Sequence, residues 1–302
     1  MSQRVKRHAG LRGIRRDVIG YCFLAPFLLL FFVFTILPIF VSAGYSLTYF
    51  NMVDTPRFIG FTNFRNLFLN DEIFILALKN TFIFALIIGP AGFLFSFIAA
   101  WFINVMKFKK FYALGFYAPS IVSGVAMSVI WLYFFSGDKF GLINNVLIKL
   151  GVITQPILWT MDPSTIMPVV IFVSAWMSMG TGFLVFLAGF QNIPGELLEA
   201  SHIDGVSTRF QELRYIVAPI MRPQMLFSAI NSIVGAFSVF DIAVQLCGMP
   251  SPNYAAHTIV AHMYDYAFIR FETGYASAVS VVLFVITFTL GRLAMRVFSS
   301  KE

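Results

Sequence analysis

Residues 20–46, GYCFLAPFLLLFFVFTILPIFVSAGYS, form a long stretch that contains no charged side chain. A helix of about 20 apolar residues is long enough to cross the hydrocarbon core of a bilayer, which is about 30 Å thick. The stretch follows the basic segment 1–17, MSQRVKRHAGLRGIRRD, as the apolar core of a secretory signal peptide would. A cleavable core has only about 7 to 15 residues, so residues 20–46 predict a retained transmembrane helix.

Five further apolar stretches follow, and each is long enough to cross a bilayer: 81–103, 111–135, 167–190, 225–247 and 274–291. The composition agrees with this count, because 59% of the 302 residues are hydrophobic and only 12% are charged. Water-soluble domains carry about a quarter charged residues. The sequence therefore predicts an all-α, polytopic membrane protein with about six transmembrane helices in a single domain, residues 20–298.

The basic residues are distributed unevenly between the two sides of such a topology. Fifteen of the 21 Lys and Arg residues fall in segments 1–19, 104–110 and 191–224 and in the C-terminal part from Arg292 onward. An excess of positive charge marks the cytoplasmic side of a membrane protein. We therefore expect a cytoplasmic basic N-terminus over 1–19, a cytoplasmic tail over 299–302, and no need for a nucleic-acid partner to explain the net charge of +7.

The longest predicted cytoplasmic connection is 191–223, QNIPGELLEASHIDGVSTRFQELRYIVAPIMRP. Pro194 suits a first helical turn, and Glu196 and Glu199 favour the positively polarised N-terminal end of that helix. Asp204 and Gly205 then predict a turn, since glycine adopts positive φ without steric cost.

A second helical stretch is expected after this turn, over residues 207–217. Pro219 is expected to end it, because the residue before a proline is biased away from helical dihedrals. Two short helices at an angle would form a charged elbow that protrudes from the membrane.

This connection resembles the cytoplasmic EAA loop of ABC importer permeases in Glu199, Ala200, Ser201, Asp204, Gly205, Ile216 and Pro219. The approach over residues 176–200, WMSMGTGFLVFLAGFQNIPGELLEA, is similar to the binding-protein-dependent sugar branch, of maltose-permease type. Residues 21–40 and the segment FIGFTNFRNLF at 58–68 support the same family. Two departures stand out: Ser201 replaces the usual second alanine, and the interval from Gly205 to Pro219 is one residue longer than the common form, with Ala218 where leucine is usual.

The resemblance implies type I ABC importer permease architecture and a transport subunit rather than an enzyme. The elbow would dock into a separate cytoplasmic ATPase dimer, with Glu199 pairing with a cationic group there, Gly205 setting the bend, and Ala200 and Ser201 allowing close packing. ATP and Mg would be bound by that ATPase, and no cofactor is expected on this chain, which contains no Gly-Lys pair for a P-loop.

The further partners implied by the family are a second, homologous permease in a heterodimer and an extracellular or lipid-anchored solute-binding protein. The substrate would be a carbohydrate, and family likeness favours an oligosaccharide. The location would be the prokaryotic plasma membrane. From a different transport class, an ion-coupled secondary transporter stays open, although it predicts ionisable relays and inverted repeats, and the chain shows one deep acidic residue and no repeat.

A polar face is expected on the fifth span. Asp241 is the acidic residue well inside a predicted span, where charge is costly and commonly functional. On a continuous helix, Asn231, Ser238 and Gln245 would share one broad face with it. These four residues are candidates for the substrate path, and the alternative is that they hold the bundle together or bond a partner permease.

Two other segments carry polar signals. His257, His262 and Asp265 invite a metal interpretation, but a spacing of five does not stack two imidazoles on one helical face, so no metal site is predicted. We expect these residues to contact the solute-binding protein instead. In segment 138–166, apolar residues fall on one helical face opposite Asn144, which predicts a short interfacial helix.

Overall fold

The computed structural model describes residues 11–178 and 180–298, and most of these residues are helical. In chain order, the elements are α1 (Leu11–Phe31), η1 (Phe32–Ile36), α2 (Leu37–Tyr45), β1 (Thr48–Tyr49), β2 (Arg57–Phe58), α3 (Thr62–Leu69), α4 (Glu72–Asn104), α5 (Lys109–Ile121), α6 (Gly124–Phe134), α7 (Leu142–Lys149), α8 (Pro163–Met177), α9 (Thr181–Gln191), α10 (Gly195–Ile203), α11 (Arg209–Glu212), η2 (Leu213–Val217), α12 (Ala218–Ile220), α13 (Arg222–Phe237), α14 (Asp241–Cys247), η3 (Pro252–Tyr254), α15 (Ile259–Tyr264), η4 (Asp265–Ile269) and α16 (Thr273–Phe298).

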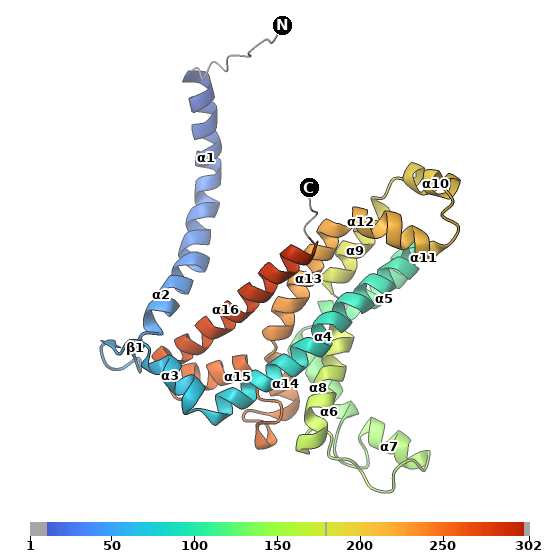
Figure 1. Cartoon of the computed structure of the whole chain (residues 1–302). Coiled ribbons are helices and arrows are strands. Elements are labelled where there is room, and N and C mark those ends of the chain that lie inside the picture. The colour runs from blue at the N-terminus through green and yellow to red at the C-terminus, as the bar shows by residue number, and fades with distance from the viewer. Residues whose placement is uncertain (1–10, 179, 299–302) are drawn as a thin grey trace.

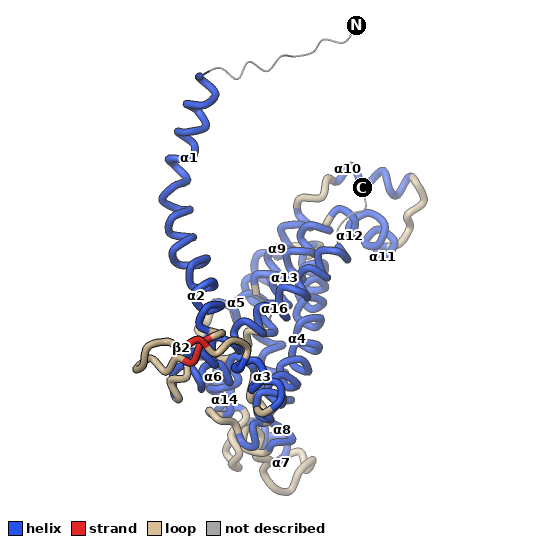
Figure 2. Tube along the Cα trace, turned by 60° about the vertical axis from the view of Figure 1, so that its left-hand side comes forward, coloured by secondary structure: helices blue, strands red, loops and turns tan. Residues whose placement is uncertain are grey.

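The first predicted span is confirmed as a helix over Gly20–Tyr45, made of α1, η1 and α2. It stands apart from the other helices and meets them only near its α2 end (Figure 1). Its apolar side chains are largely exposed, as expected of a surface that faces lipid or another membrane helix. A two-stranded antiparallel ribbon, in which Thr48 pairs with Phe58, follows near the foot of α2 (Figure 2).

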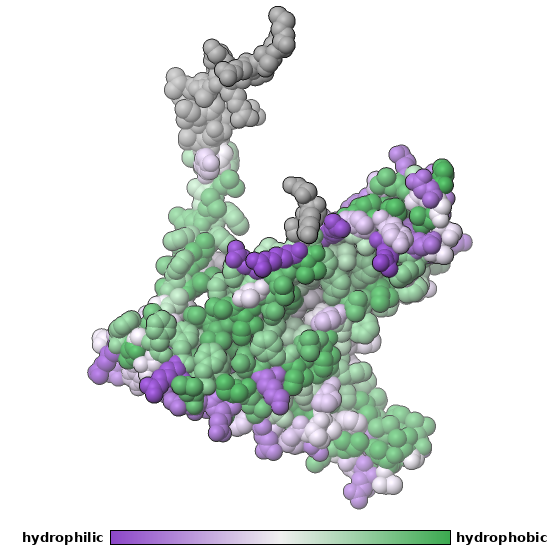
Figure 3. All heavy atoms as spheres, viewed as in Figure 1, coloured by the Kyte–Doolittle hydropathy of each residue, from purple (hydrophilic) through white to green (hydrophobic). Residues whose placement is uncertain are grey.

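The remaining spans form a bundle around α4, which packs against α9 and α13, while α16 packs on α13. The predicted second span is confirmed, but its helix begins at Glu72 rather than residue 81. The sixth likewise extends to Phe298. Over the described residues, five helices are long and apolar enough to cross a membrane, and a sixth is counted when the bent pair α5 and α6 is taken as one span. Hydrophilic residues gather at the ends of this bundle, and hydrophobic ones cover its flanks (Figure 3).

Three predicted spans are interrupted rather than continuous. The third bends by 93° between α5 and α6, where Val122 takes extended dihedrals. The fourth is divided into α8 and α9, with Gly180 at non-helical dihedrals before α9. The fifth breaks between α13 and α14, where Phe240 has φ −142° and ψ −65°. Backbone polar groups freed at such breaks are tolerated at membrane depth only inside protein or beside a water-filled cavity.

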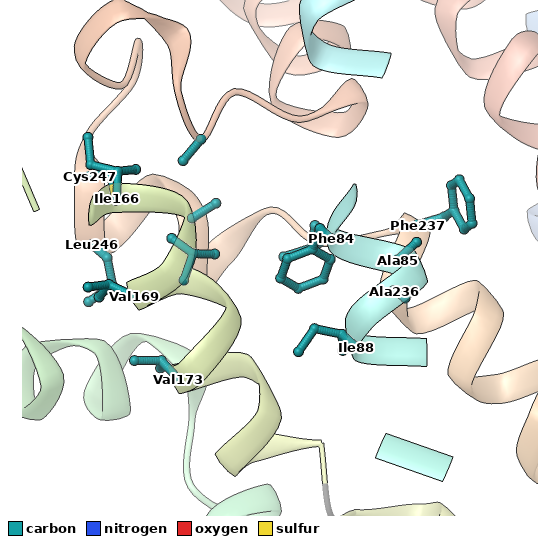
Figure 4. Packing of buried hydrophobic residues seen from close by; sticks show 14 of the residues in the cluster. Phe84, Ala85, Ile88, Ile166, Val169, Val173, Ala236, Phe237, Leu246 and Cys247 are labelled. Atoms are coloured by element: carbon teal, nitrogen blue, oxygen red, sulfur yellow. The ribbon is translucent and has the colours of Figure 1, made fainter. Parts of the chain in front are cut away.

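The largest buried cluster joins α4 to α8 and to the two halves of the fifth span. Phe84 and Ile88 point from α4 towards α8, which contributes Ile166, Val169 and Val173 (Figure 4). Lipid tails are as apolar as these side chains, so their close van der Waals packing, rather than exclusion from water, stabilises the bundle.

A polar cluster, here called the Asp71 clasp, joins three segments at the end of the bundle opposite the 191–223 connection. Asp71 caps α4 by accepting a hydrogen bond of 2.8 Å from the Phe74 amide. Its other oxygen accepts a hydrogen bond of 2.6 Å from the Tyr275 hydroxyl of α16 and lies 3.2 Å from Nε2 of His262 in α15. The Tyr266 hydroxyl donates to the same oxygen at 3.3 Å. One carboxylate thus ties the second and sixth spans to the segment before the sixth.

The expectation that the two histidines contact a binding protein is wrong, because both are buried. His262 is 1% exposed and His257 is 3% exposed. Burial, together with the neighbouring His262, lowers the pKa of His257 to about 4, so the His257 ring is neutral at physiological pH. These side chains pack the interior instead of forming a docking surface.

The predicted short helix in segment 138–166 is confirmed as α7, and its Asn144 side chain points inward. Asn144 is fully buried, and its amide donates to the carbonyls of Ser136, Asp138 and Ile157 at 3.0 to 3.2 Å. Its side-chain oxygen accepts hydrogen bonds from the Ile157 amide at 3.1 Å and from Nε1 of Trp159 at 2.9 Å. The Asn144 side chain therefore joins the two ends of the hairpin 136–159, and the apolar side chains on the opposite side of α7 face outward.

Candidate functional site

The first half of the elbow is helix α10, which differs in detail from the prediction. Pro194 is the residue before the helix, with φ −61° and ψ 129°, rather than part of its first turn. Glu196 occupies that first turn, whereas Glu199 lies one turn further on and is exposed. The helix dipole therefore acts on Glu196. No ion pair joins Glu199 to another of the described residues.

Ala200 and Ser201 point in different directions. Ala200 is exposed, but Ser201 is 3% exposed, and its hydroxyl donates to the Leu198 carbonyl at 2.7 Å. Ser201 therefore packs inside the elbow, and the close packing expected of it is with the elbow's own residues. Its polarity is satisfied locally, which explains why serine is accommodated where the family usually has alanine.

The predicted turn after α10 is present and depends on Gly205, whose φ is +94°. The Asp204 amide donates to the Ala200 carbonyl at 3.0 Å, and the Val206 amide donates to the Ser201 carbonyl at 3.0 Å. These bonds satisfy the last carbonyls of α10 in the way that glycine-ended helices do. Ile203 projects beside the turn and is 87% exposed, so the tip of the elbow presents an apolar side chain as well as charge.

The second half of the elbow begins at Arg209 rather than residue 207. Thr208 caps it, since its hydroxyl accepts a hydrogen bond from the Gln211 amide and the Gln211 side chain accepts from the Thr208 amide in return. The prediction that Pro219 ends this helix is wrong, because the helix continues through Pro219 to Ile220.

A π-helical turn over Leu213–Val217 makes this continuation possible. In it, the Ala218 amide donates to the carbonyl of Leu213, five residues back. The wider turn relieves the usual clash of a proline ring with the preceding turn, and Pro219 then lies in the first turn of α12. Ile216, on the π turn, is half-buried.

The elbow is anchored in the bundle by Val217 and Met221, which are buried with Leu187 and Phe190 of α9 in one cluster. Gly189 permits this approach, because a side chain at that position would collide with Met221. Only Met221 separates α12 from α13, so the elbow is directly joined to the fifth span (Figure 1).

A cavity of about 440 Å³ lies along α13 from Ser228 onward, between α4, α8, α9, α13 and the start of α14. Three of the four residues predicted for the substrate path line it: Asn231, Ser238 and Asp241. Gln245 is not among the lining residues. The prediction assumed a continuous helix, and the break before Asp241 changes the direction of α14 and of the residue one turn further on.

The cavity also has a hydroxyl wall, which the sequence did not single out. It consists of Ser96, Ser174, Ser178, Thr181, Ser228 and Ser232. The hydroxyls of Ser174 and Ser228 are buried and have no hydrogen-bond partner among the described residues. Asp241, in the first turn of α14, is the one charged residue among the described residues of the lining. In the sequence, the recurrence of small hydroxyl residues within apolar spans could have indicated this hydroxyl wall.

Metal ligation was not predicted, and within residues 11–178 and 180–298 no group of three or more His, Cys, Asp or Glu side chains is arranged to hold an ion. A helical bundle with interrupted spans around a polar cavity, joined to a protruding elbow, is the arrangement of a transport permease that is driven by another subunit. Three comparisons with known proteins define that class further.

The architecture is that of ABC importer permeases. A solved bacterial alginate ABC transporter, in complex with an alginate pentasaccharide-bound periplasmic protein, contains a chain that superposes with a TM-score of 0.79 at 23% identity, over 96% of this chain and 98% of that one. A sequence model described as the binding-protein-dependent transport system inner membrane component matches residues 92–301. The chain belongs to this family of ABC importer permeases and is a transport subunit, not an enzyme.

Relatives of the chain cover most of its length. A probable ABC transporter permease protein of Bacillus subtilis, YesP, is 36% identical over 91% of this chain and 89% of its own. The lactose transport system permease protein LacF of Rhizobium radiobacter is 31% identical over 92% and 93%. The arabinooligosaccharides transport system permease protein AraP of Bacillus subtilis is 29% identical over 93% and 88%. The alternative of an ion-coupled transporter is not supported.

Proposed function

We propose that this permease carries a carbohydrate, most simply a neutral oligosaccharide, across the prokaryotic plasma membrane. The observation that carries the proposal is the hydroxyl wall, whose buried Ser174 and Ser228 have hydrogen-bonding capacity to offer to sugar hydroxyls. The named cargoes of relatives such as LacF and AraP, lactose and arabinooligosaccharides, agree with it.

A sugar phosphate or polyol phosphate is the second candidate, because a relative 30% identical over 246 residues is a sn-glycerol-3-phosphate transport system permease. Phosphate recognition in proteins relies on Arg and Lys. Among the described residues that line the cavity there is no Lys, Arg or His, and Asp241 would repel an anion. A neutral sugar is the better match to this half of the path.

The proposed assembly contains a second, homologous permease, a cytoplasmic ATPase dimer that binds ATP and Mg, and an external solute-binding protein. Glu199, Ala200, Asp204 and Ile203 are exposed on the elbow and would meet the ATPase. This orientation makes both termini cytoplasmic, in agreement with the excess of Lys and Arg at that side. The Asp71 clasp would then lie at the external face.

Uptake by the purified importer in vesicles tests the proposal. We expect a radiolabelled neutral oligosaccharide to accumulate only when the ATPase, Mg-ATP and the binding protein are all present. Glycerol 3-phosphate, offered in the same vesicles, should not accumulate. Uptake that continues without ATP hydrolysis, or that is confined to the phosphorylated solute, would contradict the proposed function.

Substitutions of Asp241 and of Gln245 distinguish two hypotheses: that the substrate follows the cavity, or that it follows one face of a continuous helix. We expect Asp241→Ala to change saccharide uptake or the basal ATPase rate by about tenfold, as loss of a strong charge-assisted hydrogen bond would. Gln245→Ala should have a much smaller effect, because Gln245 is outside the cavity lining. Uptake kinetics measured at equal permease amounts would contradict the cavity path if both variants behaved like wild type, or if Gln245→Ala were the more impaired.

A further inference from the structure

The hairpin that carries α7 presents an apolar surface, here called the α7 face: Phe140, Leu142, Val146, Leu150 and Val152. Phe140 is 80% exposed and Leu150 is 70% exposed. Leu142, Val146 and Leu150 are spaced by four residues, so they form one stripe along the helix. A stripe of large exposed apolar residues on a soluble surface commonly marks an interaction site.

The outward position of this stripe is built into the hairpin. The five hydrogen bonds of Asn144 hold α7 against the segments before and after it, 136–138 and 157–159. Turning the apolar residues inward would leave that buried amide without partners, at a cost of about 1–3 kcal/mol for each unsatisfied group. The α7 face is therefore a fixed feature of the fold and not a loosely packed loop.

Cationic side chains border the α7 face. Lys139 and Lys149 are both exposed, one next to Phe140 and the other next to Leu150. The nearby carboxylate of Asp138 is engaged locally, since one of its oxygens accepts hydrogen bonds from the Phe140 and Gly141 amides at 2.8 and 2.7 Å. Long lysine side chains can extend from an apolar surface to place their charge in the headgroup region. Apolar residues with flanking lysines match the chemistry of an anionic membrane surface.

The α7 face also continues a surface that the membrane must already cover. Val129 and Tyr133 of the preceding helix α6 are strongly exposed, and α6 is part of the bent third span. The hairpin lies at the edge of the molecule beyond α6 (Figure 1), and in the space-filling view hydrophobic residues cover much of this part, with hydrophilic ones at its tip (Figure 3).

We propose that the α7 face inserts into the headgroup and acyl boundary of the bilayer at the end of the bundle opposite the elbow, with Lys139 and Lys149 at lipid phosphates. The hairpin is thus a lateral anchor for the bent third span. This proposal does not depend on which solute is transported, so it stands or fails separately from the carbohydrate assignment.

Spin labels placed in the complete importer in lipid vesicles test the anchor. Single cysteines at Val146 and Leu150, in a chain with Cys22→Ala and Cys247→Ala, would be labelled and compared with a label at the exposed polar Gln155 of the same hairpin. We expect the ratio of collision with oxygen to collision with a water-soluble nickel chelate to be several-fold higher at 146 and 150 than at 155. Vesicles of phosphatidylcholine with phosphatidylglycerol should raise this ratio above that in phosphatidylcholine alone.

The charge contribution has its own control. Lys139→Gln combined with Lys149→Gln should remove the difference between the two vesicle compositions and leave the labels in the lipid. Strong collision of the 146 and 150 labels with the nickel chelate would place the face in water and overturn the proposal. Protection from both reagents would mean that a second permease covers it, and protection that appears only when binding protein is added would mean a docking site for that protein; either result overturns the proposal.

Discussion

Gly205→Val is expected to reduce ATP-driven uptake by about tenfold or more. Valine at φ +94° is strained, because left-handed backbone dihedrals cost an L-residue about 1–2 kcal/mol, and a β-branched side chain adds to this. Relief of the strain would open the turn and separate Asp204 and Val206 from the carbonyls of α10. A free energy of about 1.4 kcal/mol corresponds to a tenfold change in the population of the bent elbow. Saccharide uptake and co-purification of the ATPase with the permease are the measurements.

Gly195→Ala is the matched control for this variant. Gly195 begins α10 on the same elbow, has no positive φ, and has open space where a side chain would be added. Alanine there should leave uptake and ATPase binding close to wild type. Gly205→Asn should recover part of the loss, since asparagine tolerates left-handed dihedrals better than valine does. Normal uptake by Gly205→Val would show that the elbow does not need this bend.

Asp71→Ala is expected to be the most destabilising single change in the described chain outside its apolar core. The substitution removes the cap of α4, the acceptor of the 2.6 Å bond from Tyr275, and the anion beside the buried His262. Leaving a buried polar group without its hydrogen-bond partner costs about 1–3 kcal/mol, and loss of a helix cap costs about 1 kcal/mol more. The fraction of monodisperse permease that survives heating in detergent measures the loss.

Asp162→Ala provides the comparison, because Asp162 also caps a transmembrane helix, α8, through the Ser164 amide at 2.8 Å. Asp162 is exposed and joins no clasp, so its loss should cost only about 1 kcal/mol. Asp71→Asn should fall between the two, since it keeps an acceptor for Phe74. Equal losses of heat resistance in Asp71→Ala and Asp162→Ala would show that Asp71 contributes only as a helix cap.

The pH dependence of this contribution follows from the pKa of Asp71. Burial alone would raise that pKa, but the close His262, the Tyr275 hydroxyl and the Phe74 amide outweigh burial and hold it well below its usual value of 3.8. A carboxyl whose pKa is depressed in the folded state stabilises the protein above the unfolded pKa and loses this effect only as the pH falls below it. The heat resistance lost in Asp71→Ala should therefore be the same at pH 5 and at pH 8.

The positions of the spans and of the elbow were predictable because their signals are local. An uninterrupted apolar run such as residues 20–46 has few alternatives to a membrane helix, and Gly205 marks a turn through its own backbone freedom. Glu199, Ala200 and Asp204 are exposed on the elbow, as a coupling role requires, and their contact with an ATPase stays a prediction.

The breaks and the polar clusters were not predictable in the same way. Hydropathy alone does not reveal where a helix stops inside a span, so Gln245 was assigned to the face of Asp241 although α14 is a separate helix. Asp71 and Tyr275 are 204 residues apart along the chain, and their contact exists only through the packing of α4 on α15 and α16. The buried position of Asn144 was also not predictable, since a polar residue on a short helix is more often exposed than buried by hydrogen bonds to flanking segments.

Because helix α13 is uninterrupted, a movement of the elbow at one end of it would be transmitted to its other end. Its 16 residues run from the position after Met221, beside Gly189, to Phe237, next to the cavity residue Ser238. At a rise of about 1.5 Å per residue the helix is about 24 Å long, so a tilt of about 10° at the elbow would move its other end by about 4 Å. Such an arc exceeds the diameter of a water molecule, so a small tilt of α13 driven from the elbow would be enough to widen or close the cavity.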